Sequence, residues 1–140
     1  MKFVTFVLIK KKIMEKKILL AACLLGFLAI VFGAFGAHAL KKTLTPEQLT
    51  SFETGVKYQM YHALFLLFVG MTQMITLKEK AVLFYLVLVG VMCFSGSIYM
   101  LTTSAITGIK SKIFGPITPI GGLFLILSWG YLFYAILTKK

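Results

Sequence analysis

The sequence predicts an all-α integral membrane protein, in which four antiparallel transmembrane helices form a compact bundle. Composition is the first observation behind this fold class. Of the 140 residues, 59% are apolar and only 14% are charged. Soluble domains carry nearly twice that charged share, and a chain this small cannot hide so much apolar surface from water. The second observation is four nearly uncharged runs, each close to the roughly 20 residues that cross a hydrocarbon core about 30 Å thick.

The predicted helices cover about 18–40, 46–77, 81–101 and 117–137. Helices are preferred to strands because the runs show no alternation of apolar and polar residues, and because a backbone amide in lipid must be bonded within its own segment. The connections are short and polar, so neighbouring helices are expected to run antiparallel. One of these connections is a predicted three-residue turn, Lys78-Glu79-Lys80.

Residues 1–13 form an N-terminal tail that the sequence leaves open between two interpretations. The segment Met14-Glu15-Lys16-Lys17 has the form of an ordinary beginning, so translation can start at Met14. Alternatively, the tail is a short interfacial amphipathic piece. Residues 14–140 are then a single four-span membrane domain. Cleavage after Ala37-His38-Ala39 is disfavoured because the preceding apolar run is too long for a signal core, and lipidation at Cys23 because its run is too short.

The first predicted helix carries small residues along one face, at steps of three and four: Ala22, Gly26, Ala29, Gly33 and Ala37. Small side chains let two helix backbones approach closely, and in lipid this packing replaces the hydrophobic effect that water would supply. The pattern predicts a central packing helix, and it leaves open whether the partner is internal or a second subunit. The alternative is that Gly and Ala are simply common in membrane helices.

The second predicted helix has a clear start and a polar interior. Thr45 can cap it, Pro46 suits its first position, and Gln48 can complete a capping box. Further along, Gln59 and His62 lie in one stripe at helical spacing. Polar groups in lipid are costly unless they face the bundle or water, so this stripe is expected to point inward. The stripe either forms hydrogen bonds between helices or binds a ligand.

The third and fourth predicted helices bring further polar and small residues. The fourth opens with Gly115-Pro116-Ile117-Thr118-Pro119-Ile120-Gly121-Gly122, which predicts an irregular entry packed against the other helices. Gly121 and Gly122 are expected packing positions. Four antiparallel spans bring the polar helix ends to one membrane face. They predict a polar cluster in the outer half, made of His38, Gln59, His62, Ser95, Ser97, Tyr99 and Thr118.

The net charge of +11 comes from lysines that border the apolar runs. Because they do not line one polar face, nucleic acid is not an expected partner. More lysines lie on the side of the two termini than on the opposite side. Since basic residues near helix ends stay in the cytoplasm, a location in the cell (cytoplasmic) membrane with both termini cytoplasmic is predicted.

No catalytic, metal-binding or cofactor-binding set is expected, because Arg and Asp are absent and all four glutamates lie outside the apolar runs. Glu47 and Glu53 belong to the polar first part of the second helix, which is expected on or above the outer membrane surface. We therefore predict a non-enzymatic membrane interaction or scaffold module without a cofactor, whose partners are membrane lipid and either itself or other membrane proteins. The alternative is a small transporter or channel subunit that acts as an oligomer, with His62 as its titrating group. A further alternative is a metal or enzyme site at His38 and His62 with Glu53 nearby, although the spacing matches no known metal motif.

Four segments carry a resemblance to a known family: Gly33-Ala-Phe-Gly-Ala-His-Ala-Leu40, Tyr58-Gln-Met-Tyr-His-Ala-Leu64, Phe94-Ser-Gly-Ser-Ile-Tyr99, and Ile117-Thr-Pro-Ile-Gly-Gly122 followed by Trp129. In order, and over nearly everything from Met14 onward, they resemble the YgdD/YwdK-like small inner-membrane proteins. That family is catalogued as domain of unknown function 423, and eukaryotic transmembrane protein 256 resembles it too. The resemblance implies a four-span protein of a bacterial cytoplasmic membrane, and it implies no activity, substrate or catalytic residue.

Overall fold

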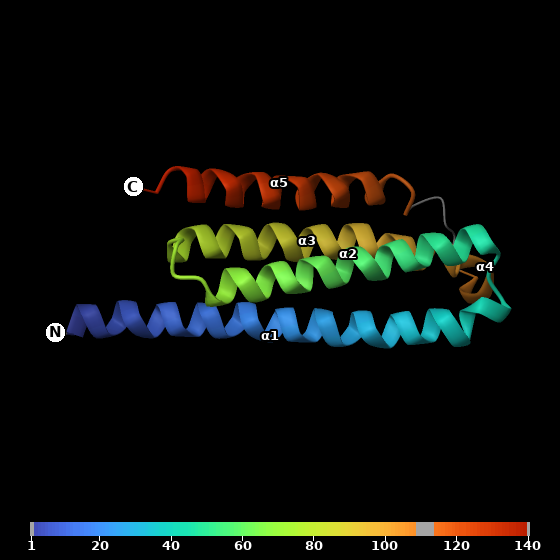
Figure 1. The fold of residues 1–140 in the computed structure, drawn as a ribbon, viewed down its shortest axis with the longest axis horizontal. Helices are drawn as coiled ribbons and strands as arrows, with labels where there is room; N and C mark the ends of the chain where they lie inside the picture. The colour runs from blue at the N-terminus through green and yellow to red at the C-terminus, as the bar shows by residue number, and fades with distance from the viewer. Residues whose placement is uncertain (1, 109–113, 140) are drawn as a thin grey trace.

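The structure is a computed structural model that describes residues 2–108 and 114–139, with side chains from Thr5 onward. The elements, in chain order, are α1 (Lys2–His38), the 3-10 helix η1 (Leu40–Lys42), α2 (Pro46–Met71), α3 (Leu77–Thr102), the short α4 (Ser104–Thr107) and α5 (Ile117–Leu137). The long helices lie side by side and alternate in direction, so α1 begins and α5 ends at the same end of the bundle (Figure 1). Throughout the described part of the chain, regular structure is helical, as the sequence predicts.

Three of the described helical segments are long and apolar enough to cross a membrane, judged by length and composition: Thr5–Lys42, Leu77–Thr102 and Ile117–Leu137. α2 has 26 residues, the same length as α3, but it begins with polar turns and carries Gln59 and His62. These polar residues lower its mean hydropathy. α2 nevertheless lies within the bundle, where it contacts both α1 and α3 (Figure 1).

α1 differs from the prediction because it starts much earlier. It is one helix of 37 residues that ends at His38, so the predicted span 18–40 covers its later part and the two residues after it. The described part of the tail belongs to the same helix. The lysines at positions 10–12 do not interrupt it because lysine is a good helix former. At about 1.5 Å per residue α1 is about 55 Å long, which exceeds the thickness of a hydrocarbon core by about 25 Å.

The turn predicted at residues 78–80 is wrong, and the helix boundaries predicted at 77 and 81 are wrong with it. α2 ends at Met71, and α3 already begins at Leu77. Thr76 caps α3, because its hydroxyl accepts from the Glu79 backbone N–H at 3.3 Å and the Glu79 carboxylate accepts from the Thr76 N–H at 2.6 Å. The three charged residues therefore form the first turn of α3 rather than a connection.

Other helix ends follow the sequence closely. Thr45 and Gln48 form the expected capping box at the start of α2, with Pro46 as the first helical residue. The side chain of Gln48 accepts from the Thr45 N–H at 3.0 Å. α5 has the predicted bounds, and Pro116 precedes its first residue.

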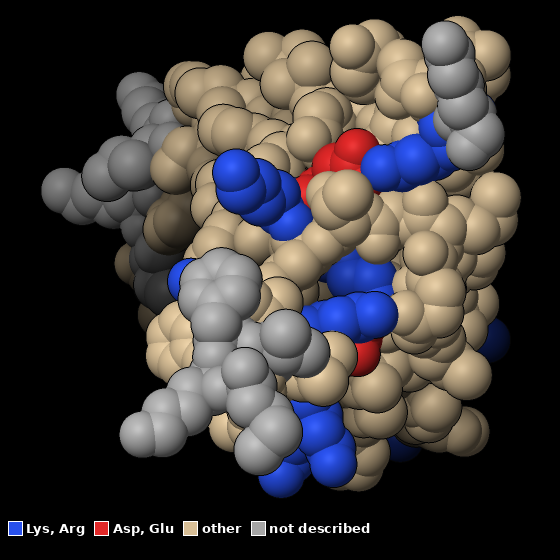
Figure 2. Space-filling model, turned by 90° about the vertical axis from the view of Figure 1, so that its left-hand side faces the viewer, with Lys and Arg blue, Asp and Glu red and all other residues tan. Residues whose placement is uncertain are grey.

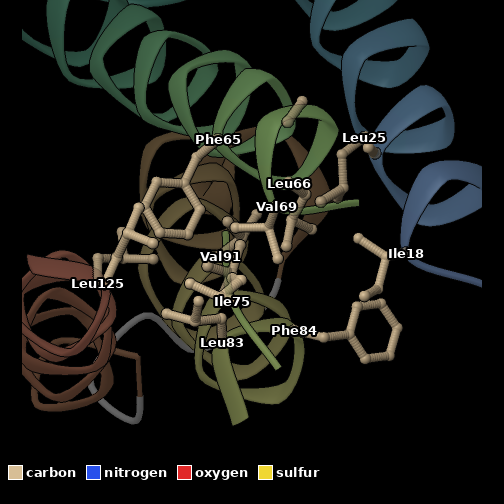
Figure 3. Packing of buried hydrophobic residues seen from close by; sticks show 14 of the residues in the cluster. Ile18, Leu25, Phe65, Leu66, Val69, Ile75, Leu83, Phe84, Val91 and Leu125 are labelled. Atoms are coloured by element: carbon tan, nitrogen blue, oxygen red, sulfur yellow. The ribbon is translucent and has the colours of Figure 1, made fainter. Parts of the chain in front are cut away.

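The main core lies between α2 and α3, with α1 on one side and α5 on the other (Figure 3). α3 is the most enclosed of the three apolar segments. In its apolar stretch 44% of the residues are buried, against 17% in the segment that contains α1 and 28% in α5. α1 and α5 consequently turn broad apolar faces outward. Side chains from every long helix and from the α2–α3 connection meet in the core: Ile18, Leu25, Phe65, Leu66, Val69, Ile75, Leu83, Phe84, Val91 and Leu125.

Candidate functional site

Gln59, near the middle of α2, joins three helices. Its Nε2 donates to the Leu25 carbonyl of α1 at 2.8 Å, and its Oε1 accepts from the Tyr99 hydroxyl of α3 at 3.0 Å. The side chain is buried. A buried amide left without partners would cost about 1–3 kcal/mol, so these bonds hold the three helices at one register.

Tyr99 is fixed by its ring as well as by its hydroxyl. The ring packs against Phe32 of α1 and Phe52 of α2, with ring centroids 5.1 and 4.9 Å away. One turn earlier on α3, the Ser95 hydroxyl donates to the Gly55 carbonyl of α2 at 2.8 Å. A Cβ on Gly55 would come within 2.9 Å of the Tyr99 ring, so glycine lets α2 and α3 approach here.

A second set of contacts joins α3 to α5. The hydroxyl oxygens of Ser97 and Thr118 lie 2.6 Å apart, and Ser97 is buried. One helical turn further along α5, a Cβ on Gly121 would overlap the backbone of Phe94. The neighbouring Gly122 has more room, because a Cβ there would lie 3.6 Å from the Phe94 ring. Gly121 is therefore the position that sets the close approach of the two backbones.

His62 stands apart from this network. Its Nδ1 donates to the Tyr58 carbonyl at 2.8 Å, and its buried Nε2 has no hydrogen-bond partner among the described residues. In a neutral ring with the hydrogen on Nδ1, Nε2 is an acceptor. His62 borders a cavity of about 250 Å³ whose other lining residues are mostly apolar or aromatic: Tyr58, Phe94, Gly122, Leu125, Ile126 and Trp129.

A cleft of about 410 Å³ opens between the first turns of α2, the end of α3 and the start of α5. Of the predicted polar cluster, only Thr118 lines it. Glu47 also lines it, and hydrogen bonds from its own backbone N–H and from the Thr45 side chain hold the pKa of its carboxyl below the usual range. The cleft pairs Glu47 with no other ionisable lining residue, and within the described ranges no group of three His, Cys, Asp or Glu residues could hold a metal ion.

The small face of α1 packs within the chain, against α2. Ala22 and Ala29 are buried, a Cβ on Gly26 would lie 3.7 Å from Ala63, and one on Gly33 would lie 3.4 Å from Val56. The partner that the sequence left open is thus a helix of the same chain.

The end of α1 differs from the predicted pattern. Ala37 is exposed, and Gly36 instead packs on Phe52, whose ring carbons would lie 3.1 Å from an added Cβ. A step of three from Gly33 stays closer to the buried face than a second step of four, because a helix has 3.6 residues per turn. His38 is exposed and does not join the polar cluster.

The sequence did not predict the ion pairs at the opposite end of the bundle. Lys80 is only 1% exposed, and its Nζ donates to the Glu15 carboxylate of α1 at 2.6 Å and to the Gly70 carbonyl of α2 at 3.2 Å. Glu79 pairs with Lys139 at 3.0 Å and so links α3 to the residues after α5. Lysines surround these few carboxylates on this end of the molecule (Figure 2).

A signal for the burial of Lys80 is present in the sequence. Lys80 precedes Leu83, Phe84 and Val87 by three, four and seven residues, and all three are buried. Residues at these steps share one face of a helix. A lysine at the border of an apolar run is typical of a membrane edge, so its position alone predicts an exposed side chain.

The amino-acid sequence matches a known protein family. A family described as "Protein of unknown function (DUF423)" matches residues 32–122. The chain belongs to the DUF423 family. The matched range runs from the end of α1 to the start of α5, and it includes all seven residues of the predicted polar cluster.

Relatives of this DUF423 chain are named as membrane proteins, and they confirm the resemblance seen in the sequence. The UPF0382 membrane protein of Haemophilus influenzae is 34% identical over 127 residues, which cover 91% of this chain and 98% of that protein. YwdK of Bacillus subtilis is 38% identical over 74% of this chain and 82% of its own length. The inner membrane protein YgdD of Escherichia coli is 29% identical over 87% of this chain and 90% of its own length. No solved structure matches the chain.

Proposed function

We propose that this chain is a four-span, non-enzymatic module of the bacterial cytoplasmic membrane, which acts by contacting lipids and other membrane proteins. The observation that carries the proposal is how the polar side chains inside the bundle are used. Gln59, Ser95 and Ser97 bond to neighbouring helices, so the polar interior serves cohesion between helices. The outward faces are then the surfaces left to meet a partner.

Three features support four spans with both termini in the cytoplasm. α2 runs alongside the apolar helices and antiparallel to α1 and α3 (Figure 1). Its polar side chains Gln59 and His62 are buried by those neighbours rather than turned toward lipid. The lysines gather at the end where α1 begins and α5 ends (Figure 2), and basic residues favour the cytoplasmic side.

The outward faces of α1 and α5 suit a lipid or protein partner. On α1 they include Leu20, Leu24, Phe27, Ile30 and Phe35, and on α5 Leu123, Ile126, Phe133, Tyr134 and Leu137. Each of these side chains is more than half exposed. In lipid such faces associate by shape and van der Waals contact, so a membrane protein partner needs no charged site.

A photo-crosslinking amino acid in living cells tests this proposal. At Phe27, which is 63% exposed, we expect discrete adducts with another membrane protein. At Ala22, on the same helix but 1% exposed, we expect none. Adducts are read as shifted bands on a denaturing gel. If neither Phe27 nor Ile126 gives a protein adduct, and the chain purifies as a solitary monomer in mild detergent, the proposal fails.

A liposome assay separates this function from transport. A module that only contacts lipids and other proteins should leave proton flux at the level of protein-free liposomes. Flux above that level which disappears in His62→Ala would instead support a transporter, because His62 is the described histidine whose side chain is buried within the bundle.

A further inference from the structure

A groove of about 500 Å³ lies between the first part of α1 and the start of α3, at the lysine-rich end of the bundle. Three of its lining residues are exposed lysines: Lys10, Lys17 and Lys78. Others are apolar, among them Ile13, Leu77 and Ala81. The groove therefore combines concentrated positive charge with an apolar surface.

None of these lysines has a carboxylate partner among the described residues. The Glu15 carboxylate forms an ion pair with Lys80, and the Lys11 Nζ lies 4.0 Å from it. The Glu79 carboxylate forms an ion pair with Lys139. Glu47 and Glu53 lie at the start of α2, at the opposite end of the bundle (Figure 1). The groove consequently keeps about three positive charges that the chain itself does not neutralise.

The two walls of the groove are held together. Lys10, Ile13 and Lys17 follow one another at steps of three and four, so they lie on one face of α1. Leu77 and Ala81 lie at a step of four on α3. The bond between Lys80 and Glu15 ties these two helices at the same level, so the groove does not depend on a ligand to bring its walls together.

We propose that this groove binds an acidic phospholipid. The lipid phosphate lies among Lys10, Lys17 and Lys78, and the glycerol and upper acyl chains lie along Ile13, Leu77 and Ala81. Basic grooves between membrane helices on the cytoplasmic side are suited to acidic headgroups, and each lysine near an acidic membrane surface contributes about 1 kcal/mol. Free phosphate would leave the apolar wall unused. The proposal names the lipid partner of the proposed membrane module and rests on its membrane placement.

Native mass spectrometry of the full chain in detergent tests the proposal, with dioleoyl phosphatidylglycerol or dioleoyl phosphatidylcholine as the probe. The wild type is expected to retain phosphatidylglycerol in preference to phosphatidylcholine. At about 1 kcal/mol, or roughly fivefold, per lysine, the variant Lys10→Gln/Lys17→Gln/Lys78→Gln should bind phosphatidylglycerol about 100-fold more weakly. A large excess of inorganic phosphate should not displace the lipid.

Two further variants make the test specific. Lys41→Gln/Lys42→Gln/Lys57→Gln removes the same charge at the opposite end and should leave retention within about twofold of wild type. Ala81→Phe fills the groove without changing charge and should also weaken retention. The proposal is overturned if the two lipids bind equally, if the control triple variant loses as much lipid as the groove variant, if phosphate displaces the lipid, or if Ala81→Phe has no effect. Melting temperatures in detergent show that each variant is folded.

Failure of the lipid proposal is distinguishable from failure of the proposed function. A chain that stays in the membrane pellet after alkaline carbonate extraction, yet shows no lipid preference, would overturn the lipid site alone. A chain that carbonate releases would overturn the membrane-spanning arrangement on which both proposals rest.

Discussion

Gly121 and Gly122 are neighbours in the sequence, yet they meet different surroundings in α5. A Cβ on Gly121 would overlap the backbone of Phe94, which cannot move aside without shifting α3. A Cβ on Gly122 would make ordinary contact with the Phe94 ring, at 3.6 Å. The sequence predicted packing roles for both, but it could not tell which one faces the α3 backbone, because that depends on how α5 is rotated in the bundle.

Gly121→Ala should destabilise the bundle. We expect a loss of about 1–3 kcal/mol, since an added methyl group in a tightly packed interface forces backbone shifts. Gly122→Ala is the matched control. Because alanine favours helix by about 1 kcal/mol over glycine, this variant should be neutral or slightly more stable than wild type. Reversible unfolding in a detergent and denaturant mixture measures both. Equal losses in the two variants would contradict the assigned α3–α5 contact.

The start of α3 is one point at which the predicted and observed helix bounds differ. Thr76 and Glu79 repeat the spacing of Thr45 and Gln48, and both pairs form capping boxes. Pro46 marks the first pair as a helix start, whereas the three charged residues Lys78, Glu79 and Lys80 have the composition of a polar turn. Burial of Lys80 against Glu15 is a contact between residues 65 positions apart, and local patterns do not reveal such pairs.

The Glu15–Lys80 pair gives a prediction for the α1–α3 contact. Glu15→Leu leaves the buried Lys80 ammonium with only the Gly70 carbonyl, so it should destabilise the fold by about 3–5 kcal/mol. Lys80→Met should cost less, because the Glu15 side chain keeps 20% exposure and has Lys11 4.0 Å away. The double variant Glu15→Leu/Lys80→Met should recover most of the loss, since no buried charge remains unpaired.

Unfolding free energies of the two single variants and the double variant form a complete cycle. Lys16→Met is the control on α1, since Lys16 is exposed, and it should stay within about 0.5 kcal/mol of wild type. Strictly additive losses in the double variant would show that Glu15 and Lys80 do not interact in the folded protein.

For the whole molecule, the sequence predicts the helical class, the antiparallel order and the bounds of α5, because apolar runs and lysine borders carry that information directly. It predicts the small face of α1 but not its partner. It places the polar cluster at one end but cannot show that Gln59, Ser95 and Ser97 bond to neighbouring helices, because those contacts depend on how the helices are rotated. The DUF423 family model matches residues 32–122, which contain all seven residues of the predicted polar cluster.

α2 is the helix on which the four-span account depends, because its polar residues keep it outside the group of clearly apolar helices. The most direct test uses single cysteines in a background of Cys23→Ala and Cys93→Ala. Exposed positions in three connections are suitable: Thr43, Met74 and Ile106. In right-side-out membrane vesicles, a membrane-impermeant thiol reagent should modify Thr43→Cys and Ile106→Cys, and it should reach Met74→Cys only after the membrane is opened. If Thr43→Cys and Met74→Cys react from the same side, α2 does not cross the membrane and the four-span arrangement is wrong.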